Sequence, residues 1–137
     1  MKVIIDTNLW ISFLLGHQTQ LVRRMLADVR FDVYVCDRII EEIRDVASRD
    51  KIRKFVSQTD VEDLMSIIHA FCQFAVIDAE VASSAVCDPK DLYLLALAET
   101  IGADYIVSGD ADLTDLGQHK QTRVVKLADF KTMMLYT

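Results

Sequence analysis

Acidic residues directly follow two apolar runs of this 137-residue chain, and their types could bind a metal ion together. Asp6 ends the run VIID and is followed by Thr7 and Asn8, whereas Asp110 and Asp112 follow the run YIVSG. Runs rich in β-branched residues predict buried strands. Because the carboxyl ends of parallel strands form the edge where sites occur, we expect Asp6, Asp110 and Asp112 at one edge of a sheet.

Two acids in predicted helices are expected to face the same edge. In the predicted helix 38–47, a projection at about 100° per residue places Glu42 at the border of the apolar stripe and Glu41 nearly opposite it. Glu42 is therefore the acid expected to turn inward, although a shift of one residue would select Glu41 instead. In the predicted helix that ends at residue 101, Asp91 lies on the apolar face, where the helix meets the sheet.

Several carboxylates at one edge repel one another and raise one another's pKa values. A divalent cation removes that conflict, and oxygen ligands without His or Cys favour hard ions such as Mg²⁺ or Mn²⁺. Such an ion activates water and binds phosphate oxygens, so the predicted chemistry is hydrolysis of a phosphodiester bond. Thr7 and Ser108 could hold a water or a phosphate oxygen, and Asn8 could position a carboxylate.

Each acid also has a purely structural explanation. Asp6 could cap the helix that follows it, Asp91 could only serve the dipole of its own helix, and Asp112 could belong to a turn. Asp88 is better explained as a helix cap, because Pro89 follows it at the first helical position. The metal site is favoured by the convergence of several acids on one edge, and not by any acid alone.

The order of the apolar runs predicts the elements that position these residues. Strands are expected over 3–5, 33–36, 74–77, 105–107 and 123–126, and helices over 9–15, 19–27, 38–47, 61–72 and 89–101, with short helices near 48–55 and after 126. Strands separated by helices indicate an α/β fold whose central, mainly parallel sheet of about five strands has helices on both faces. The length predicts a single domain spanning residues 1–137.

Composition restricts the class of protein further. Hydrophobic residues make up 52% and charged residues 26%, which favours a compact fold over disorder. No apolar run reaches the roughly 20 residues needed to span a membrane, so we expect a cytoplasmic protein. The three cysteines, Cys36, Cys72 and Cys87, are expected to be buried small hydrophobes and not disulfide partners or zinc ligands.

Three stretches in this order, IIDTN, EEI and DPKDLYLLALAETIGADYIVSGDADL, resemble the PIN-domain family. The likeness extends from Val3 to about Phe130. It is greatest for the bacterial and archaeal branch described as toxin components of toxin–antitoxin systems. The resemblance implies a three-layer α/β/α sandwich and a metal-dependent ribonuclease.

The resemblance also implies the residues of the site. The acidic quartet of catalytic and metal-binding residues corresponds to Asp6, Glu42, Asp91 and Asp110. Asp112 matches an additional acid, Asp88 a frequently acidic neighbour, and Thr7, Asn8 and Ser108 the polar residues around the quartet. The implied cofactor is Mg²⁺ or Mn²⁺, and the implied partners are an RNA substrate, a cognate antitoxin protein and a second copy of the chain in a homodimer.

The leading hypothesis is an endonuclease that hydrolyses single-stranded RNA. The alternative is a catalytically silent PIN scaffold that binds a protein or RNA, because a net charge of −6 does not favour RNA affinity. The basic segment 49–54 could guide a phosphate backbone, although such segments are usually solvated helix faces. A phosphotransfer enzyme of the haloacid dehalogenase type is disfavoured, because its pattern wants an aspartate at the position of Asn8.

Overall fold

The computed structural model describes residues 1–17, 19–81 and 91–136, and within them a six-stranded sheet forms the centre. The strands are β1 (Lys2–Ile5), β2 (Asp32–Val35), β3 (Gln73–Phe74), β4 (Tyr105–Ser108), β5 (Gln118–His119) and β6 (Thr122–Lys126). Their order is β3-β2-β1-β4-β6-β5, and the pair of β5 with β6 is antiparallel whereas the other pairs are parallel. The predicted α/β fold with a mainly parallel sheet is confirmed.

The sheet differs from the prediction at its two edges. It has six strands and not about five, because the two-residue strand β5 pairs with β6 across a tight turn in which Lys120 has a φ of 52°. Two residues are too few to produce an alternating pattern, and no glycine marks this turn. At the other edge, β3 covers only Gln73–Phe74 instead of 74–77, because it pairs with β2 at just two positions.

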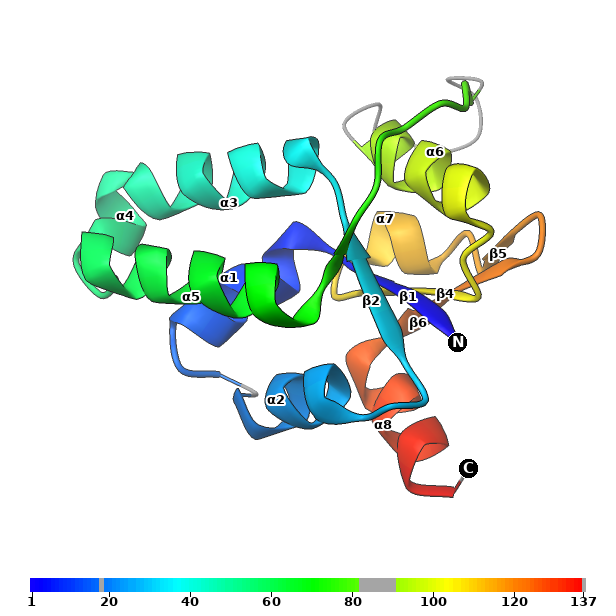
Figure 1. The fold of residues 1–137 in the computed structure, drawn as a ribbon, viewed down its shortest axis with the longest axis horizontal. Helices are drawn as coiled ribbons and strands as arrows, with labels where there is room; N and C mark the ends of the chain where they lie inside the picture. The colour runs from blue at the N-terminus through cyan, green and yellow to red at the C-terminus, as the bar shows by residue number, and fades with distance from the viewer. Residues whose placement is uncertain (18, 82–90, 137) are drawn as a thin grey trace.

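Helices lie on both sides of the strands (Figure 1): α6 is above them in that view, and α2 and α8 are below. The helices are α1 (Thr7–Leu14), α2 (Thr19–Ala27), α3 (Asp37–Ser48), α4 (Asp50–Arg53), α5 (Gln58–Phe71), α6 (Leu92–Ile101), α7 (Ala111–Thr114) and α8 (Leu127–Tyr136). In the part of the chain that is described, none of them has the length and apolar character required to cross a membrane.

A rigid core fixes the strand that carries the first acid. β1 lies between β2 and β4, and its residues Val3, Ile4 and Ile5 are at most 1% exposed. Trp10 of α1 and Leu94 of α6 are completely buried in the same core. Each large apolar side chain that is buried in this way contributes about 1.5–3 kcal/mol. The end of β1 is therefore held from both faces of the sheet.

α3 begins one residue before the predicted helix 38–47. Its N-cap is Cys36, and Asp37 is the first helical residue, where its charge interacts favourably with the helix dipole. α6 ends at Ile101, the predicted end of this helix, and Gly102 follows it as the C-cap with a φ of 67°. The predicted helix start at Asp88 and Pro89 lies outside the described residues, as does Cys87, whereas Cys36 and Cys72 are buried as expected.

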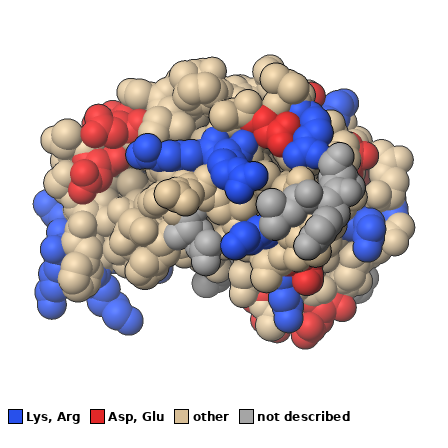
Figure 2. All heavy atoms as spheres, turned by 90° about the horizontal axis from the view of Figure 1, so that it is seen from below, with Lys and Arg blue, Asp and Glu red and all other residues tan. Residues whose placement is uncertain are grey.

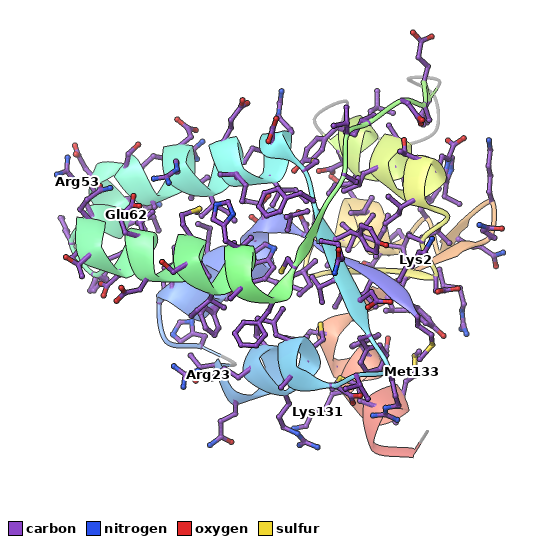
Figure 3. All side chains as sticks on the ribbon, viewed as in Figure 1. Lys2, Arg23, Arg53, Glu62, Lys131 and Met133 are labelled. Atoms are coloured by element: carbon purple, nitrogen blue, oxygen red, sulfur yellow. The ribbon has the colours of Figure 1, made fainter. Side chains whose placement is uncertain are left out.

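α4 joins the helices α3 and α5, and Glu62 of α5 is labelled in Figure 3. Arg44 Nη1 of α3 lies 2.7 Å from Glu62 Oε1. At the first turn of α5, the Ser57 hydroxyl accepts a hydrogen bond from the Asp60 N–H at 3.1 Å. The Asp60 carboxylate in turn accepts one from the Ser57 N–H at 2.9 Å. This reciprocal pair is a capping box, which satisfies two backbone donors at the helix start.

We predict that Ser57→Ala lowers the free energy of unfolding by about 1 kcal/mol, because it leaves the Asp60 N–H without its acceptor. Thr59→Ala, at an exposed position of the same turn, is the control and should change that free energy by less than about 0.5 kcal/mol. Urea denaturation of both variants measures the difference. Equal midpoints would show that the capping box does not stabilise α5.

Candidate active site

An open cleft lies beside the carboxyl ends of β1 and β4. Its volume is about 520 Å³. The residues that line it are Asp6, Thr7, Asn8, Arg38, Glu41, Glu42, Asp45, Val46, Arg49, Asp91 and Asp110. The four acids of the predicted quartet therefore border one cleft, although they come from segments that are far apart in the sequence.

Asp6 is buried at the point where β1 ends. Its N–H donates to the Val107 carbonyl of β4 at 2.9 Å, and the residue is only 5% exposed. Although Asp6 occupies the N-cap position of α1, its side chain makes no capping hydrogen bond. Its Oδ2 instead accepts a hydrogen bond from the Ser108 hydroxyl at 2.7 Å. Helix capping therefore does not explain this carboxylate.

The surroundings of Asp6 disfavour its negative charge. Burial raises the pKa of Asp6 above its ordinary value of 3.8, and the charges of Asp110 and Glu42 raise it further. The hydrogen bonds from Ser108 and from the Thr7 N–H act in the opposite direction without cancelling these effects. A cation placed beside Asp6 would relieve the conflict.

Glu42 is held by hydrogen bonds at both carboxylate oxygens. Its Oε2 accepts from the Thr7 hydroxyl at 3.1 Å and from the Tyr93 hydroxyl at 2.9 Å. Its Oε1 accepts from Arg38 Nε at 3.3 Å, across one turn of α3. Glu41 also lines the cleft but is exposed, whereas Glu42 is partly buried, in the orientation that the helical projection indicates.

Tyr93 is a site residue that the sequence reasoning missed. Its hydroxyl lies between Thr7 and Glu42, and its ring lies 5.4 Å from the guanidinium carbon of Arg38. Burial raises the pKa of Tyr93, so the phenol remains protonated and able to donate. The feature of the sequence that could have indicated this role is an aromatic residue with a polar end among the aliphatic residues of the helix. The sequence does not reveal which segment that tip contacts.

Ser108 connects two of the acids. Its hydroxyl is completely buried, donates to Asp6 and accepts the N–H of Asp110 at 3.0 Å. The Oδ1 of Asp110 in turn accepts the N–H of Asp112 at 3.0 Å and so caps α7. Asp112 is exposed and does not line the cleft, so its N–H serves the turn while its carboxylate faces solvent.

Asp91 and Asn8 border the cleft with different exposure. Asp91 occupies the N-cap position of α6 without a capping hydrogen bond from its side chain, and it is partly buried. Asn8, at the start of α1, is exposed. Asp88, the acidic neighbour implied by the family resemblance, lies outside the described residues.

The donor set suits a hard divalent cation, but its positions are not those of an assembled metal centre. Four carboxylates without nitrogen or sulfur ligands match the preference of Mg²⁺ and Mn²⁺. A cation bound beside Asp6 would stabilise its negative charge, which the surroundings disfavour. Among the described residues, however, no three His, Cys, Asp or Glu side chains are grouped closely enough to hold a metal ion.

The sequence matches the family model of the PIN domain over residues 2–112. This stretch contains the whole of the cleft described above. The chain therefore belongs to the PIN-domain family.

Solved structures show the same fold at low sequence identity. PAE2754 from Pyrobaculum aerophilum has a TM-score of 0.68 and 11% identity, and the match covers 100% of this chain and 91% of that one. The structure of VapBC2 from Rickettsia felis bound to a promoter DNA fragment has a TM-score of 0.62 and 10% identity, and the match covers 92% of this chain and 98% of that one. The PIN domain of human SMG5 has a TM-score of 0.56 and 12% identity over 98% and 99%. None of the curated proteins matches the chain.

We predict that Asp6→Asn melts at the same temperature as the wild type or a few degrees higher at neutral pH, because it removes a buried charge but keeps an acceptor for Ser108. The raised pKa of Asp6 means that the folded chain binds its proton more tightly than the unfolded chain does. The wild type therefore gains stability relative to Asp6→Asn as the pH falls toward 3.8, and the difference between the two proteins should shrink.

Melting curves of both proteins between neutral and acidic pH measure this effect. Glu41→Gln, which removes an exposed charge from the same cleft, is the matched control and should change stability by less than about 0.5 kcal/mol. A large loss of stability in Asp6→Asn at neutral pH would contradict the assignment of Asp6 as an electrostatically unfavourable group.

Proposed function

We propose that this chain is a metal-dependent endoribonuclease that hydrolyses phosphodiester bonds of single-stranded RNA. The observation that carries the proposal is the convergence of Asp6, Glu42, Asp91 and Asp110 on one open cleft. Membership of the PIN-domain family, whose members are typically nucleases, supports it. We assign the same four acids as the metal ligands, and we leave out Asp112 because it is exposed and does not line the cleft.

The chain's own residues prepare these acids before any ligand binds. Ser108 orients Asp6, and the hydroxyls of Thr7 and Tyr93 orient Glu42. Such supporting hydrogen bonds set the direction of a ligand oxygen and reduce the reorganisation that binding requires. A Mg²⁺ or Mn²⁺ ion bound by the four carboxylates would supply a Lewis acid and a water of lowered pKa.

Positive side chains beside the acids give the RNA backbone a place to bind. Arg38 and Arg49 both line the cleft. Figure 2 shows that Lys and Arg side chains also gather over the middle of a second face, while acidic side chains lie in separate groups. Arg24 and Lys131 also line one hollow outside the cleft. The net charge of −6 is therefore unevenly distributed, which weakens its objection to phosphate binding.

We propose a cognate antitoxin protein as the partner. The structural similarity to VapBC2 supports this proposal. An apolar groove between α2 and α5 supports it too, because Leu26, Ala27, Ile67 and Phe71 line it and Phe71 is 56% exposed. Exposed apolar grooves of this kind accept the apolar face of an amphipathic helix.

We predict that Mn²⁺ binds the wild type and raises its melting temperature, whereas Asp6→Asn shows no measurable binding, because an amide oxygen replaces a charged ligand. Cleavage of an unstructured RNA should fall at least about a hundredfold in the same variant. Calorimetric titration and a gel assay measure the two effects, and Glu41→Gln should retain both. Undiminished metal-dependent cleavage by a clean preparation of Asp6→Asn would contradict the proposal.

The same experiment separates the nuclease from the silent interaction module. The dispersed positions of the acids in the described residues are the observation that favours the module. A module would bind RNA or a protein partner tightly in the presence of chelator and would cleave nothing when Mn²⁺ is added. A nuclease requires the metal for cleavage and loses it with Asp6.

We predict that Tyr93→Phe weakens Mn²⁺ binding about tenfold, because Glu42 loses one of the two hydroxyl donors that orient its Oε2. Tyr105→Phe is the control. It removes the same hydroxyl from a β4 residue whose ring packs against Phe130 of α8, and it should leave the affinity unchanged. Calorimetry gives both dissociation constants. Equal affinities in the two variants would show that the Tyr93 hydroxyl does not position Glu42.

A further inference from the structure

The guanidinium of Arg38 occupies the cleft beside Glu42. Its Nε lies 3.3 Å from Glu42 Oε1, and its guanidinium carbon lies 5.4 Å from the centre of the Tyr93 ring. The side chain is 53% exposed, so one side of the guanidinium contacts the protein while the rest faces solvent. The hypothesis of an acidic metal site does not account for this arginine.

The two oxygens of Glu42 differ in how accessible they are to a further ligand. Oε2 already accepts hydrogen bonds from Thr7 and Tyr93, which occupy both of its lone pairs. Among the described residues, Oε1 accepts only from Arg38. A divalent ion that binds Glu42 without disturbing the two hydroxyls must therefore use Oε1, where it meets the guanidinium.

We propose that Arg38 exchanges partners: it pairs with Glu42 in the metal-free cleft and binds a phosphate of the RNA strand once a divalent ion occupies Glu42 Oε1. This inference rests on the proposed function. A guanidinium presents a planar fork of donors that matches phosphate oxygens as well as a carboxylate. Arg38 is thus a positioning residue for Glu42 before metal binding and a substrate-binding residue afterwards.

The exchange requires movement of one side chain and no movement of α3. Ile39, which follows Arg38, and Ile43, which follows Glu42, are completely buried and hold the helix backbone in place. The Tyr93 ring can keep the guanidinium within the cleft as it turns, through a cation–π contact. Because the pair is partly exposed, its interaction is weak enough to be displaced, and it should reduce metal affinity only about two- to fivefold.

Arg49 provides a matched control within the same cleft. It also lines the cleft, but its Nη2 pairs with Asp45 Oδ2 at 3.1 Å and not with Glu42. Arg38→Gln and Arg49→Gln therefore remove the same charge from the same surface, and only the first frees an oxygen of the predicted metal ligand. A comparison of the two separates direct competition from the general effect of charge.

The first experiment is calorimetric titration of Mn²⁺ into the wild type and both variants, in about 0.15 M salt to screen distant charges. Arg38→Gln should bind Mn²⁺ about two- to fivefold more tightly than the wild type, and Arg49→Gln should match the wild type. Equal or weaker binding by Arg38→Gln, or no binding by either it or the wild type, would overturn the inference.

The second experiment measures the anisotropy of a labelled single-stranded oligouridine, with a gel check that the strand stays intact. In chelator, Arg38→Gln should bind the strand as the wild type does, because the arginine is engaged with Glu42. In Mn²⁺, Arg38→Gln should bind it about five- to tenfold more weakly than the wild type. Arg49→Gln should change binding by the same factor in both conditions, because its partner Asp45 is not one of the predicted metal ligands. An Arg38 effect that does not depend on Mn²⁺ would also overturn the inference.

These results differ from those of a structural defect and of a failed nuclease proposal. Misfolding in Arg38→Gln would weaken metal and RNA binding together, whereas the exchange predicts opposite changes, and a melting curve checks the fold. If the wild type cleaves RNA but Arg38→Gln has unchanged affinities, only this inference fails. If the opposite changes appear but the wild type cleaves nothing, the nuclease proposal fails and the exchange stands.

Discussion

The buried carboxylate of Asp6 is the constraint on which the site depends. Burial of a charge is costly unless partners compensate it. Here the Ser108 hydroxyl and the first turn of α1 give partial compensation, while Asp110 and Glu42 add repulsion. The core beneath β1 holds the acid in place despite this conflict. The fold therefore stores an unfavourable arrangement of charge that a cation can relieve.

The contacts of Glu42 compensate its negative charge in the same region, where positive charge is scarce. Two hydroxyls orient one of its oxygens, and a guanidinium of the same helix neutralises the other. Arg38 thus provides the metal-free cleft with a local counter-charge. Since this pair is partly exposed, it stabilises the resting arrangement without making the carboxylate unavailable, which a completely buried ion pair would do.

Tertiary contacts also explain why the separate acids are not equivalent. Asp6 is buried, Asp91 and Glu42 are partly buried, and Asp112 faces solvent beyond the turn that starts α7. The acids therefore differ in how far they are removed from water and in which charges lie near them. A buried acid such as Asp6 is held in place, whereas an exposed acid such as Asp112 can move. The negative net charge of the chain is a sum over these groups and over cationic faces elsewhere, and it does not describe the potential at any one site.

The sequence by itself determined the order of strands and helices, the position of Asp6 and Asp110 at one sheet edge, and the inward side of Glu42, because apolar periodicity records which face of an element is buried. It did not determine β5, which is too short for a period, or the extent of β3. Only the tertiary structure decided that Tyr93 and Thr7 meet at Glu42 and that Arg38 enters the cleft. The contacts among Thr7, Glu42 and Tyr93 join residues 35 to 86 positions apart. They depend on sheet twist and side-chain rotamers, which local patterns do not encode.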